Sequence, residues 1–409
     1  MLALMKNYIL LIIVFSVNST FAQLCTQDNR FTEVEYFTDN EIDTVLDIKY
    51  GFATNHLGVI DSLYLDAFFP NNIIDTLNKR PVVLMIHGGG FSGGQKEDRW
   101  GECFELAKRG FVTFSVSYRL GWNQADPTTQ LLAMYRAHQD VHASIRYIVD
   151  NSSTYKIDTN WIFVGGTSAG ANTANNLVYT HQSDYEIIYP GISTLLGNLN
   201  TSTNSLINTF SLKGVFNNWG SVFVNDIEPN ELVPQIAFHG EADTVVSIDT
   251  ASNGYRIGSR AIHNYLVAEN ICSDITVKPG GGHGVYADAN GTTFRTARVS
   301  CFFKSIFCSS CADSYATTIV IPDCSSNTTF TEEFKSEDAW VVSPNPFNDY
   351  LNISNITGNE NISLYDLNGS LIYSNSQINS ENLYLLPIGV YVLCIKEDTK
   401  SKRIKIIKE

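Results

Sequence analysis

The stretch WIFVGGTSAGANTANNLVYT, residues 161–180, decides the fold of this chain. Its apolar start, Trp161–Val164, predicts a short buried strand. The glycines that follow permit a tight turn, and Ala169–Thr180 predicts a helix of small residues. The turn itself, GTSAG at 166–170, fits the pattern G-x-S-x-G between a strand and a helix. Ser168 would project its hydroxyl above the sheet, beside a helix N-terminus that favours developing negative charge, and is therefore a candidate nucleophile.

Strand-like and helix-like runs alternate around this stretch, from Ile42 to about Cys308. Alternation over such a length predicts an α/β fold, with a mostly parallel central sheet covered by helices on both faces. The predicted strands are 63–69, 81–86, 111–117, 161–164, 212–216, 234–238 and 275–277, and the predicted helices are 102–109, 128–150, 169–180, 255–269 and 293–307. Residues 184–211 break the alternation, because this Asn-, Ser- and Thr-rich stretch is too long for an ordinary connection. It is either a lid over a pocket or a surface insertion.

Three further segments begin where a predicted strand ends. In HGGGF, residues 87–91, backbone without side chains can turn two N–H groups toward an oxyanion, with the N–H of Ala169 as a third donor. Asp243 and His283 each follow a later strand. The chain order Ser, Asp, His differs from the orders in chymotrypsin and subtilisin, and it is the order of the fold in which G-x-S-x-G forms a nucleophile elbow. It predicts His283 as the general base and Asp243 as the acid that orients its ring.

Several neighbouring residues have competing interpretations. Glu241 follows the same strand as Asp243 and is its rival as the triad acid. Trp219 could form a wall of the substrate pocket or belong to the core. His239 ends a predicted strand and could line the site, but steric support is the favoured role.

His138 and His142 stand four residues apart on the predicted helix 128–150, a spacing that can bind zinc. The Glu of the H-E-x-x-H pattern is missing, so we interpret the two as solvated or satisfied helix histidines. No metal or cofactor is predicted. The formal net charge is −15, and no Lys and Arg cluster stands outside 400–408. This charge argues against nucleic acid and anionic membranes as partners.

The N-terminus predicts a secretory signal peptide, residues 1–22. An apolar run, Tyr8–Val17, precedes TFA at 20–22, which offers small residues at the −3 and −1 positions of a cleavage site. A membrane anchor is one rival interpretation, but a spanning helix needs about 20 apolar residues and this run is roughly half as long. A lipoprotein at Cys25 is another, disfavoured because Leu24 replaces the small residue expected there. We expect cleavage, and no stable membrane insertion of the remaining chain.

The eight cysteines fit an exported chain that meets an oxidising compartment. Spacing alone does not fix the connectivity. Two pairings are expected, Cys25–Cys103 and Cys272–Cys301. The pair in Cys308-x-x-Cys311 is interpreted as a structural disulfide or as free thiols, because no second ligand pair accompanies it.

The pattern changes after Cys308. Residues 309–338 are rich in Ser, Thr and Asp and predict a linker. Residues 339–409 predict a small all-β sandwich, because short strands alternate with turn signals. Its predicted strands are 351–353, 362–365, 371–373, 390–395 and 403–407. The predicted division is therefore a signal peptide, an α/β domain over 23–308, the linker and the C-terminal β domain.

HGGGF (87–91), VSYRLG (116–121) and GTSAG (166–170) resemble bacterial carboxylesterases of the type-B and hormone-sensitive-lipase-like groups, including feruloyl-esterase-like secreted enzymes. The resemblance covers about Ile42–Phe307 and implies an α/β-hydrolase fold. It also implies which backbone groups are the oxyanion donors, namely Gly89, Gly90 and Ala169. Residues 184–211 depart from the family pattern, which leaves the substrate open.

SPNPF (343–347), LYDLNG (364–369) and LPIGVY (386–391) resemble the type A C-terminal sorting domain of the type IX secretion system. The resemblance covers Val341–Glu409. It implies that the secretion machinery is a partner and that the protein is secreted or held at the cell surface. Such domains are commonly removed during export.

Together these features predict a secreted serine hydrolase that cleaves carboxylic esters through an acyl-enzyme intermediate. Feruloyl, acetyl and simple short-chain esters all remain open as substrates. One alternative is a serine peptidase of the same fold, although nothing resembles the β-propeller of the prolyl oligopeptidase group. The other is an esterase-like binding protein, although such proteins typically lack an intact triad.

Overall fold

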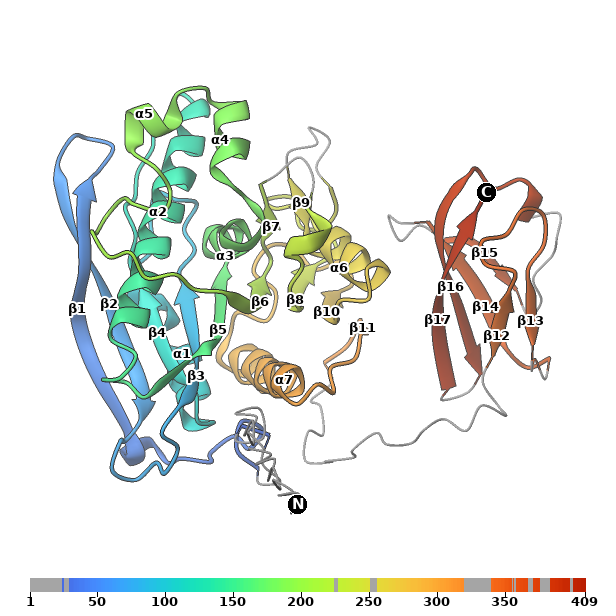
Figure 1. Ribbon diagram of the computed structural model, residues 1–409, viewed down its shortest axis with the longest axis horizontal. Helices are drawn as coiled ribbons and strands as arrows, with labels where there is room; N and C mark the ends of the chain where they lie inside the picture. The colour runs from blue at the N-terminus through green and yellow to red at the C-terminus, as the bar shows by residue number, and fades with distance from the viewer. Residues whose placement is uncertain are drawn as a thin grey trace, which may run out of the picture.

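The computed structural model describes residues 24–25, 29–223, 227–250, 256–319 and most of 340–409 (Figure 1). Within the last range, the described residues are 340–354, 356, 358–366, 371–375, 383–397 and 400–409. The predicted signal peptide and most of the predicted linker lie outside them. Among the described helices, none is long and apolar enough to cross a membrane.

A nine-stranded sheet forms the centre of the larger domain. Its strands are β1 (Ile42–Thr54), β2 (Ile60–Pro70), β3 (Arg80–Ile86), β4 (Val112–Val116), β5 (Ile157–Thr167), β6 (Leu212–Asn218), β8 (Gln235–Gly240), β10 (Ser273–Lys278) and β11 (Ser314–Ala316). Their order is β1-β2-β4-β3-β5-β6-β8-β10-β11. The pairs β1–β2 and β2–β4 are antiparallel, and every pair from β4 to β11 is parallel. This mostly parallel sheet confirms the predicted α/β-hydrolase fold.

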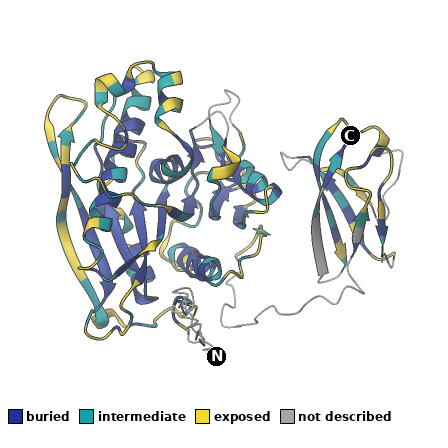
Figure 2. Ribbon diagram, viewed as in Figure 1, coloured by how far each residue is buried: buried dark blue, intermediate teal, exposed yellow. Residues whose placement is uncertain are grey.

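Helices cover both faces of the sheet (Figure 1). They are α1 (Trp100–Lys108), α2 (Thr128–Asp150), α3 (Ala169–Tyr179), α4 (Gln182–Ile188), α5 (Ile192–Leu196), α6 (Ser259–Ala268) and α7 (Ala289–Phe307). The central strands between them are buried (Figure 2). In β3, Leu84 and Ile86 pack with α2 and α3, whereas Val83 and Met85 pack with α1 and α7. Because successive side chains of a strand point to opposite faces, a strand covered on both sides has to be apolar throughout.

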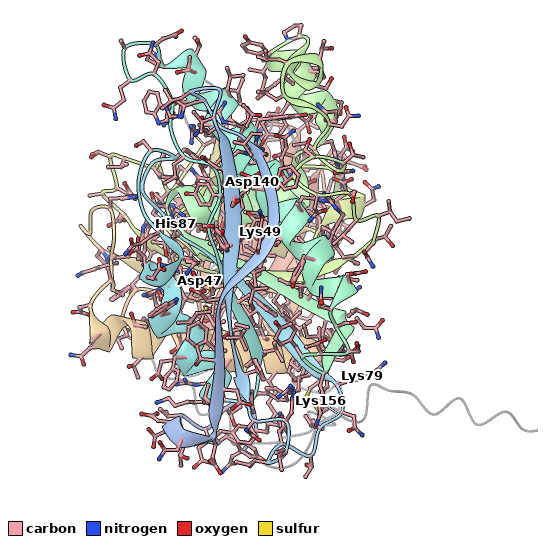
Figure 3. All side chains as sticks on the ribbon, turned by 90° about the vertical axis from the view of Figure 1, so that its left-hand side faces the viewer. Asp47, Lys49, Lys79, His87, Asp140 and Lys156 are labelled. Atoms are coloured by element: carbon pink, nitrogen blue, oxygen red, sulfur yellow. A yellow bond between two sulfur atoms is a disulfide. The ribbon has the colours of Figure 1, made fainter. Side chains whose placement is uncertain are left out.

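The strand β1 was not predicted from the sequence. It lies at one edge of the sheet, and Figure 3 views that edge, where Asp47 and Lys49 are labelled. Its register with β2 shifts between Val45 and Ile48 and again between Lys49 and Gly51. Such irregularities interrupt the period-two alternation of side chains, so the hydrophobic pattern could not reveal this strand.

The first residues of the predicted linker 309–338 belong to the hydrolase sheet instead. Ser314–Ala316 pairs in parallel with β10 as the edge strand β11. Asp313 Oδ1 accepts a hydrogen bond from Ser273 N (2.9 Å). The polar composition hid this strand, because backbone pairing rather than side-chain burial defines a short edge strand.

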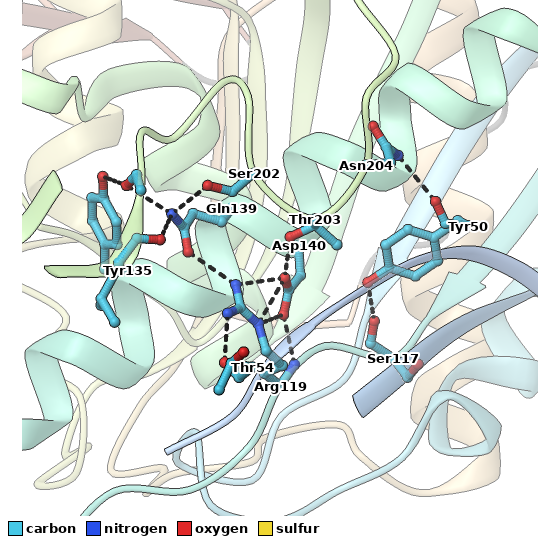
Figure 4. A network of polar contacts seen from close by, with 12 residues as sticks. Tyr50, Thr54, Ser117, Arg119, Tyr135, Gln139, Asp140, Ser202, Thr203 and Asn204 are labelled. Atoms are coloured by element: carbon cyan, nitrogen blue, oxygen red, sulfur yellow. Dashed lines mark hydrogen bonds and ion pairs between the residues drawn. The ribbon is translucent and has the colours of Figure 1, made fainter. Parts of the chain in front are cut away.

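Residues 184–211 pack against α2 and β1. Their apolar side chains form a small core with Tyr135 of α2, made of Tyr185, Ile192 and Leu199. Polar contacts hold the later part (Figure 4). Thr203 Oγ1 donates to Asp140 (2.7 Å), and Asn204 Nδ2 donates to the carbonyl of Tyr50 (3.0 Å). These contacts favour the interpretation as a surface insertion over the interpretation as a lid.

The described part of 340–409 forms two antiparallel sheets. The strand β12 (Val341–Ser343) pairs with β13 (Asn352–Ser354). The other sheet contains β14 (Asn361–Tyr365), β15 (Leu371–Asn375), β16 (Gly389–Glu397) and β17 (Lys400–Lys408), in the order β15-β14-β16-β17. A separate core lies beneath them and includes Trp340, Phe347, Ile362, Leu364, Leu393 and Ile406. This agrees with the all-β expectation.

Both predicted disulfide pairings are wrong. Cys25 is bonded to Cys308, and Cys272 is bonded to Cys311. Cys103 is a free buried thiol, and Cys301 is disulfide-bonded to a residue other than Cys272. The first bridge joins residues 283 positions apart, because the end of α7 packs beside the start of the described chain. Sequence spacing carries no information about such a tertiary neighbour.

Candidate active site

Ser168 occupies a strained turn between β5 and α3. Its φ of 55° and ψ of −118° are uncommon for a residue with a side chain. A Cβ on Gly166 would lie 2.4 Å from the carbonyl carbon of Gly170, and a Cβ on Gly170 would lie 2.1 Å from the oxygen of Ile86. Glycine is therefore required on both sides of Thr167–Ala169, which explains the spacing of the G-x-S-x-G pattern.

The structure brings Ser168, Asp243 and His283 together from three strand ends. His283 Nε2 lies 2.8 Å from Ser168 Oγ, and His283 Nδ1 lies 2.7 Å from Asp243 Oδ2. The three residues follow β5, β8 and β10, and the carboxyl ends of parallel strands meet at one edge of a sheet. A carboxylate can only accept, so Nδ1 carries the ring hydrogen and Nε2 of the neutral ring is free to accept from the serine hydroxyl.

Asp243 is a buried carboxylate surrounded by donors. Its Oδ1 accepts from the backbone N–H groups of Val245 (2.8 Å) and Val246 (3.0 Å). Its Oδ2 contacts His283 Nδ1 and lies 3.2 Å from His239 Nε2. Burial opposes ionisation, but the hydrogen bonds from His239, Val246, His283 and Val245 outweigh it and hold the pKa of Asp243 well below its usual value. Asp243 is therefore ionised at neutral pH.

Glu241, the rival acid, makes its side-chain contacts with residues other than His283. Its side chain is 51% exposed, and its Oε1 lies 3.9 Å from Arg260 Nη1. Its Oε2 accepts from the N–H of Gly280 (3.3 Å). The geometry thus places Asp243, and not Glu241, beside the imidazole.

The glycine loop after β3 turns sharply next to the elbow. Gly89 has a φ of 106° and Gly90 a φ of 62°, both in the region that favours glycine. A Cβ on Gly89 would lie 2.1 Å from the carbonyl oxygen of Gly93, so no larger residue fits there. Ala169 is the first residue of α3, where a backbone N–H has no acceptor within the helix. The three predicted oxyanion donors therefore come from a glycine turn and a helix start.

Two aromatic residues hold this loop and were not identified from the sequence. The ring of Tyr118 stacks on that of His87, with centroids 4.3 Å apart, and its hydroxyl donates to the His87 carbonyl (3.0 Å). Trp122 Nε1 donates to the carbonyl of Gly90 (3.0 Å). Both follow β4, the parallel neighbour of β3. The motif VSYRLG marked a strand end, but the adjacency of these two strands was needed to reveal the contact.

Trp219 lies against His283 rather than in an open pocket wall. It is 3% exposed, and its ring meets the imidazole edge-on with centroids 6.3 Å apart. The indole of Trp219 also contacts Arg295, whose Cζ lies 5.5 Å from the indole centroid. Arg295 in turn donates a hydrogen bond to Glu102 (3.0 Å). Trp219 therefore links the imidazole to a buried ion pair between α1 and α7.

The other histidines singled out from the sequence contact protein partners, and His138 and His239 are buried whereas His142 is partly exposed. His239 is fully buried and so does not line an open site. His138 Nδ1 lies 3.4 Å from the Tyr185 hydroxyl, and His142 Nδ1 lies 2.8 Å from Arg146 Nη1. Burial lowers the pKa of His138 to about 3, and burial together with Arg146 lowers the pKa of His142 to about 4. Both rings are therefore neutral under ordinary conditions.

Two family models match the chain. The BD-FAE model matches residues 65–231, which include the glycine loop and Ser168. The model of the secretion system C-terminal sorting domain matches residues 341–409. Asp243 and His283 lie beyond the first match, so their place in the site rests on the geometry above.

Curated proteins with similar sequences cover parts of this chain. Esterase E4 of Myzus persicae is 30% identical over 137 residues, which are 32% of this chain and 24% of that protein. Arylacetamide deacetylase-like 2 of Homo sapiens is 25% identical over 194 residues, 42% of this chain and 45% of that one. The chain thus spans about a quarter of the length of the first of these relatives.

Among solved structures, the thermophilic esterase Est2 of Thermogutta terrifontis with propionate bound is similar, with a TM-score of 0.47 and 16% identity. It covers 68% of this chain and 97% of its own. The strand order is that of the α/β-hydrolase fold, residues 65–231 are similar to the BD-FAE family, and residues 341–409 are similar to the secretion system C-terminal sorting domain.

Proposed function

We propose that this protein is an exported serine esterase in which Ser168, His283 and Asp243 form the catalytic triad. The observation that carries the proposal is the continuous pair of contacts from Ser168 Oγ to His283 and from His283 to Asp243, at 2.8 and 2.7 Å. A serine that contacts a neutral imidazole, which in turn contacts an ionised carboxylate, is the arrangement that activates a weak oxygen nucleophile.

In the first half-reaction, Ser168 Oγ attacks the ester carbonyl carbon while His283 Nε2 takes the hydroxyl proton. The proton then passes from His283 to the alcohol oxygen, the carbon–oxygen bond of the ester breaks, and the acyl group remains on Ser168. Asp243 stays ionised throughout, because its hydrogen bonds keep its pKa low. Its charge stabilises the imidazolium that forms in each step.

In the second half-reaction, water takes the place of the alcohol. His283 removes a proton from the water as it attacks the acyl carbon, and returns that proton to Ser168 Oγ as the acid leaves. The products are one carboxylic acid and one alcohol, and the enzyme is regenerated.

The negative charge on the carbonyl oxygen would be met by the N–H groups of Gly89, Gly90 and Ala169. Support comes from the turn geometry of the two glycines and from the position of Ala169 at the start of a helix. Loss of a single such donor typically costs about 3 kcal/mol in the transition state. A rigid loop is needed for this role, and Tyr118 and Trp122 supply that rigidity through their contacts with His87 and Gly90.

We assign the reaction to carboxylic esters, and leave the acyl and alcohol groups to experiment. The relative named an esterase supports hydrolysis of an acyl–oxygen bond, and the BD-FAE match covers the segment with Ser168. For export, residues 1–22 would act as a cleaved signal peptide, and residues 341–409 would engage the secretion machinery.

The test compares wild-type protein with Ser168→Ala on p-nitrophenyl acetate, p-nitrophenyl butyrate, methyl ferulate and acetylated xylan. A peptide p-nitroanilide serves as the amide substrate. We expect turnover of at least one ester, none of the amide, and none of any substrate by the variant. A fluorophosphonate probe should label Ser168 in the wild type, as read by peptide mass spectrometry. Ester turnover that survives in Ser168→Ala, or labelling at another residue, would overturn the assignment.

A further inference from the structure

We propose that His239 is a second imidazole partner of Asp243 and positions that carboxylate for His283. This role rests on the proposed function, since it concerns the same triad. The sequence favoured only steric support for His239. The contacts instead give it a specific hydrogen-bonding role at the rear of the site.

The surroundings of His239 fix which ring nitrogen carries the hydrogen. Nε2 faces two acceptors, the carbonyl oxygen of Val246 at 3.0 Å and Asp243 Oδ2 at 3.2 Å. Neither can donate, so Nε2 must carry the hydrogen and share it between them. In the neutral ring Nδ1 can only accept, and it lies 2.7 Å from Ser259 Oγ. The Ser259 hydroxyl also lies 3.0 Å from the carbonyl oxygen of Gly220, so its one hydrogen faces two acceptors.

The ring is held in this orientation from three elements. His239 belongs to β8 and is fully buried. Ser259, on α6, is also fully buried and accepts in turn from Asn217 Nδ2 of β6 (3.1 Å). The polar contacts therefore run from Asn217 through Ser259 and His239 to Asp243, with the Gly220 carbonyl as a second acceptor of the Ser259 hydroxyl. A ring fixed at both nitrogens cannot rotate away without leaving buried polar atoms unpaired.

For Asp243, the consequence is that both carboxylate oxygens are fully engaged. Oδ1 accepts two backbone N–H groups, and Oδ2 accepts one imidazole N–H from each side. The carboxylate plane is thereby fixed, and Oδ2 is aimed at His283 Nδ1. The donation from His239 also withdraws negative charge from the oxygen that faces His283.

The charged groups nearby leave this arrangement undisturbed. Arg260 follows Ser259 on α6, but its guanidinium turns toward Asp249 and Glu241. Asp243 is thus the charged side chain that contacts the His239 ring in the described structure. Removing the His239 donor should concentrate negative charge on Oδ2, strengthen its attraction for protonated His283, and so hold His283 in the inactive protonated form up to a higher pH.

The test uses His239→Leu, which removes the donor, and His239→Gln, whose amide N–H can replace it. The control is His263→Leu. His263, on α6, is buried like His239, and its Nδ1 also contacts a serine hydroxyl, that of Ser273 at 2.9 Å, but it does not contact Asp243. For His239→Leu we expect kcat to fall about tenfold with KM unchanged, and the acid limb of the kcat/KM profile to move to higher pH. His239→Gln should restore most of both. The His263→Leu control should lower thermal stability without moving the acid limb.

A second measurement does not need activity or a folded variant at position 239. In wild-type protein with ¹⁵N-labelled histidine, the His239 Nε2–H proton should be protected from exchange, and its resonance should move in Asp243→Asn. An acid limb that stays in place in a folded His239→Leu, or that moves equally in His263→Leu, would refute the positioning role. So would an Nε2 resonance insensitive to Asp243→Asn. Failure of the proposed function would look different, since wild-type protein would then lack ester turnover while the resonance still responded.

Discussion

Asp140 and Asp243 are both buried carboxylates that accept several hydrogen bonds, but the side chains that donate to them differ. Asp140, on α2, accepts from the backbone N–H and the guanidinium of Arg119 and from Thr203 Oγ1 (Figure 4). Asp243 accepts from two backbone groups and from two imidazoles. Each carboxylate side chain is fully buried.

The difference lies in the partner. A guanidinium stays charged at every accessible pH, so the Asp140 network is a closed ion pair that ties α2 to the insertion and to the segment after β4. An imidazole can gain and lose a proton near neutral pH, and His283 is 24% exposed on the side of Ser168. A buried carboxylate therefore stabilises the structure at Asp140, and in the proposed mechanism it takes part in the chemistry at Asp243, because only the partner of Asp243 can titrate and reach solvent.

The largest effect is expected at the open end of the Asp243 network. Ser168→Ala should lower kcat by about 10⁶-fold, because comparable nucleophile losses in a serine protease reach that size. The unfolding midpoint should stay close to that of the wild type, since the change removes only one hydroxyl. Steady-state kinetics with a circular dichroism melt would measure both quantities. A variant that is inactive only because it is unfolded would not count in favour of the role.

Asp243→Asn should lower kcat by about 10⁴-fold, because an amide favours the wrong tautomer of His283. Its matched control is Glu241→Gln, two residues earlier on the same loop. Since Glu241 is half exposed and faces Gly280 and Arg260, we expect its kcat/KM to remain within about threefold of the wild type. If Glu241→Gln instead lost most of its kcat/KM while Asp243→Asn kept it, Glu241 would be the triad acid.

Asp140→Asn tests the closed network. Leaving Arg119 buried without its charge partner should cost about 3–5 kcal/mol of stability, as other broken buried pairs do. The folded fraction should keep its kcat within a few-fold. The control is Asp249→Asn, because the side chain of Asp249 is 45% exposed and that of its partner Arg260 is 23% exposed, and we expect a loss of less than about 1 kcal/mol. Urea denaturation checks the stabilities, and equal losses in the two variants would contradict the distinction.

Asp243 should also contribute a pH-dependent part of the stability. Its pKa is lowered in the folded state, so its contribution is present above the pKa of an unfolded aspartate, about 3.9, and is lost as pH falls toward the lower folded value. The difference in melting temperature between wild type and Asp243→Asn should therefore be complete near pH 7 and narrow below about pH 4. A difference that stays constant from pH 7 to pH 3 would show that the carboxylate charge contributes nothing.

The smallest catalytic effect is expected from removal of residues 339–409. The α/β domain has its own core and contains every residue of the proposed site, so kcat/KM of the purified truncation should match that of the full chain. Export should fail, as measured by activity in the medium against activity in cells. Loss of specific activity in the truncation would show that this domain does more than sort.

Local sequence was sufficient for much of this protein. The apolar run 81–86 and the stretch 161–180 predicted two buried strands and the turn at Ser168, because apolar periodicity and glycine spacing reflect local backbone demands. The structure then shows that the two strands are neighbours. The order of Ser168, Asp243 and His283 along the chain, each after a strand, named residues that the structure brings together. The small strands of the C-terminal domain were likewise visible from their alternation with turn residues.

Only the tertiary structure decided the rest, since those features depend on which distant segments become neighbours. The disulfide Cys25–Cys308 joins chain segments far apart in sequence, and no spacing rule could reveal it. The irregular strand β1 and the short strand β11 exist through backbone pairing with their neighbours, which leaves little pattern in their side chains. The choice of Asp243 over Glu241 depended on the path of one loop, and the contact of His239 with Asp243 on the packing of α6 behind β8. The sequence determined which chemical groups follow the strands, and tertiary packing determined their distances and hydrogen-bond partners.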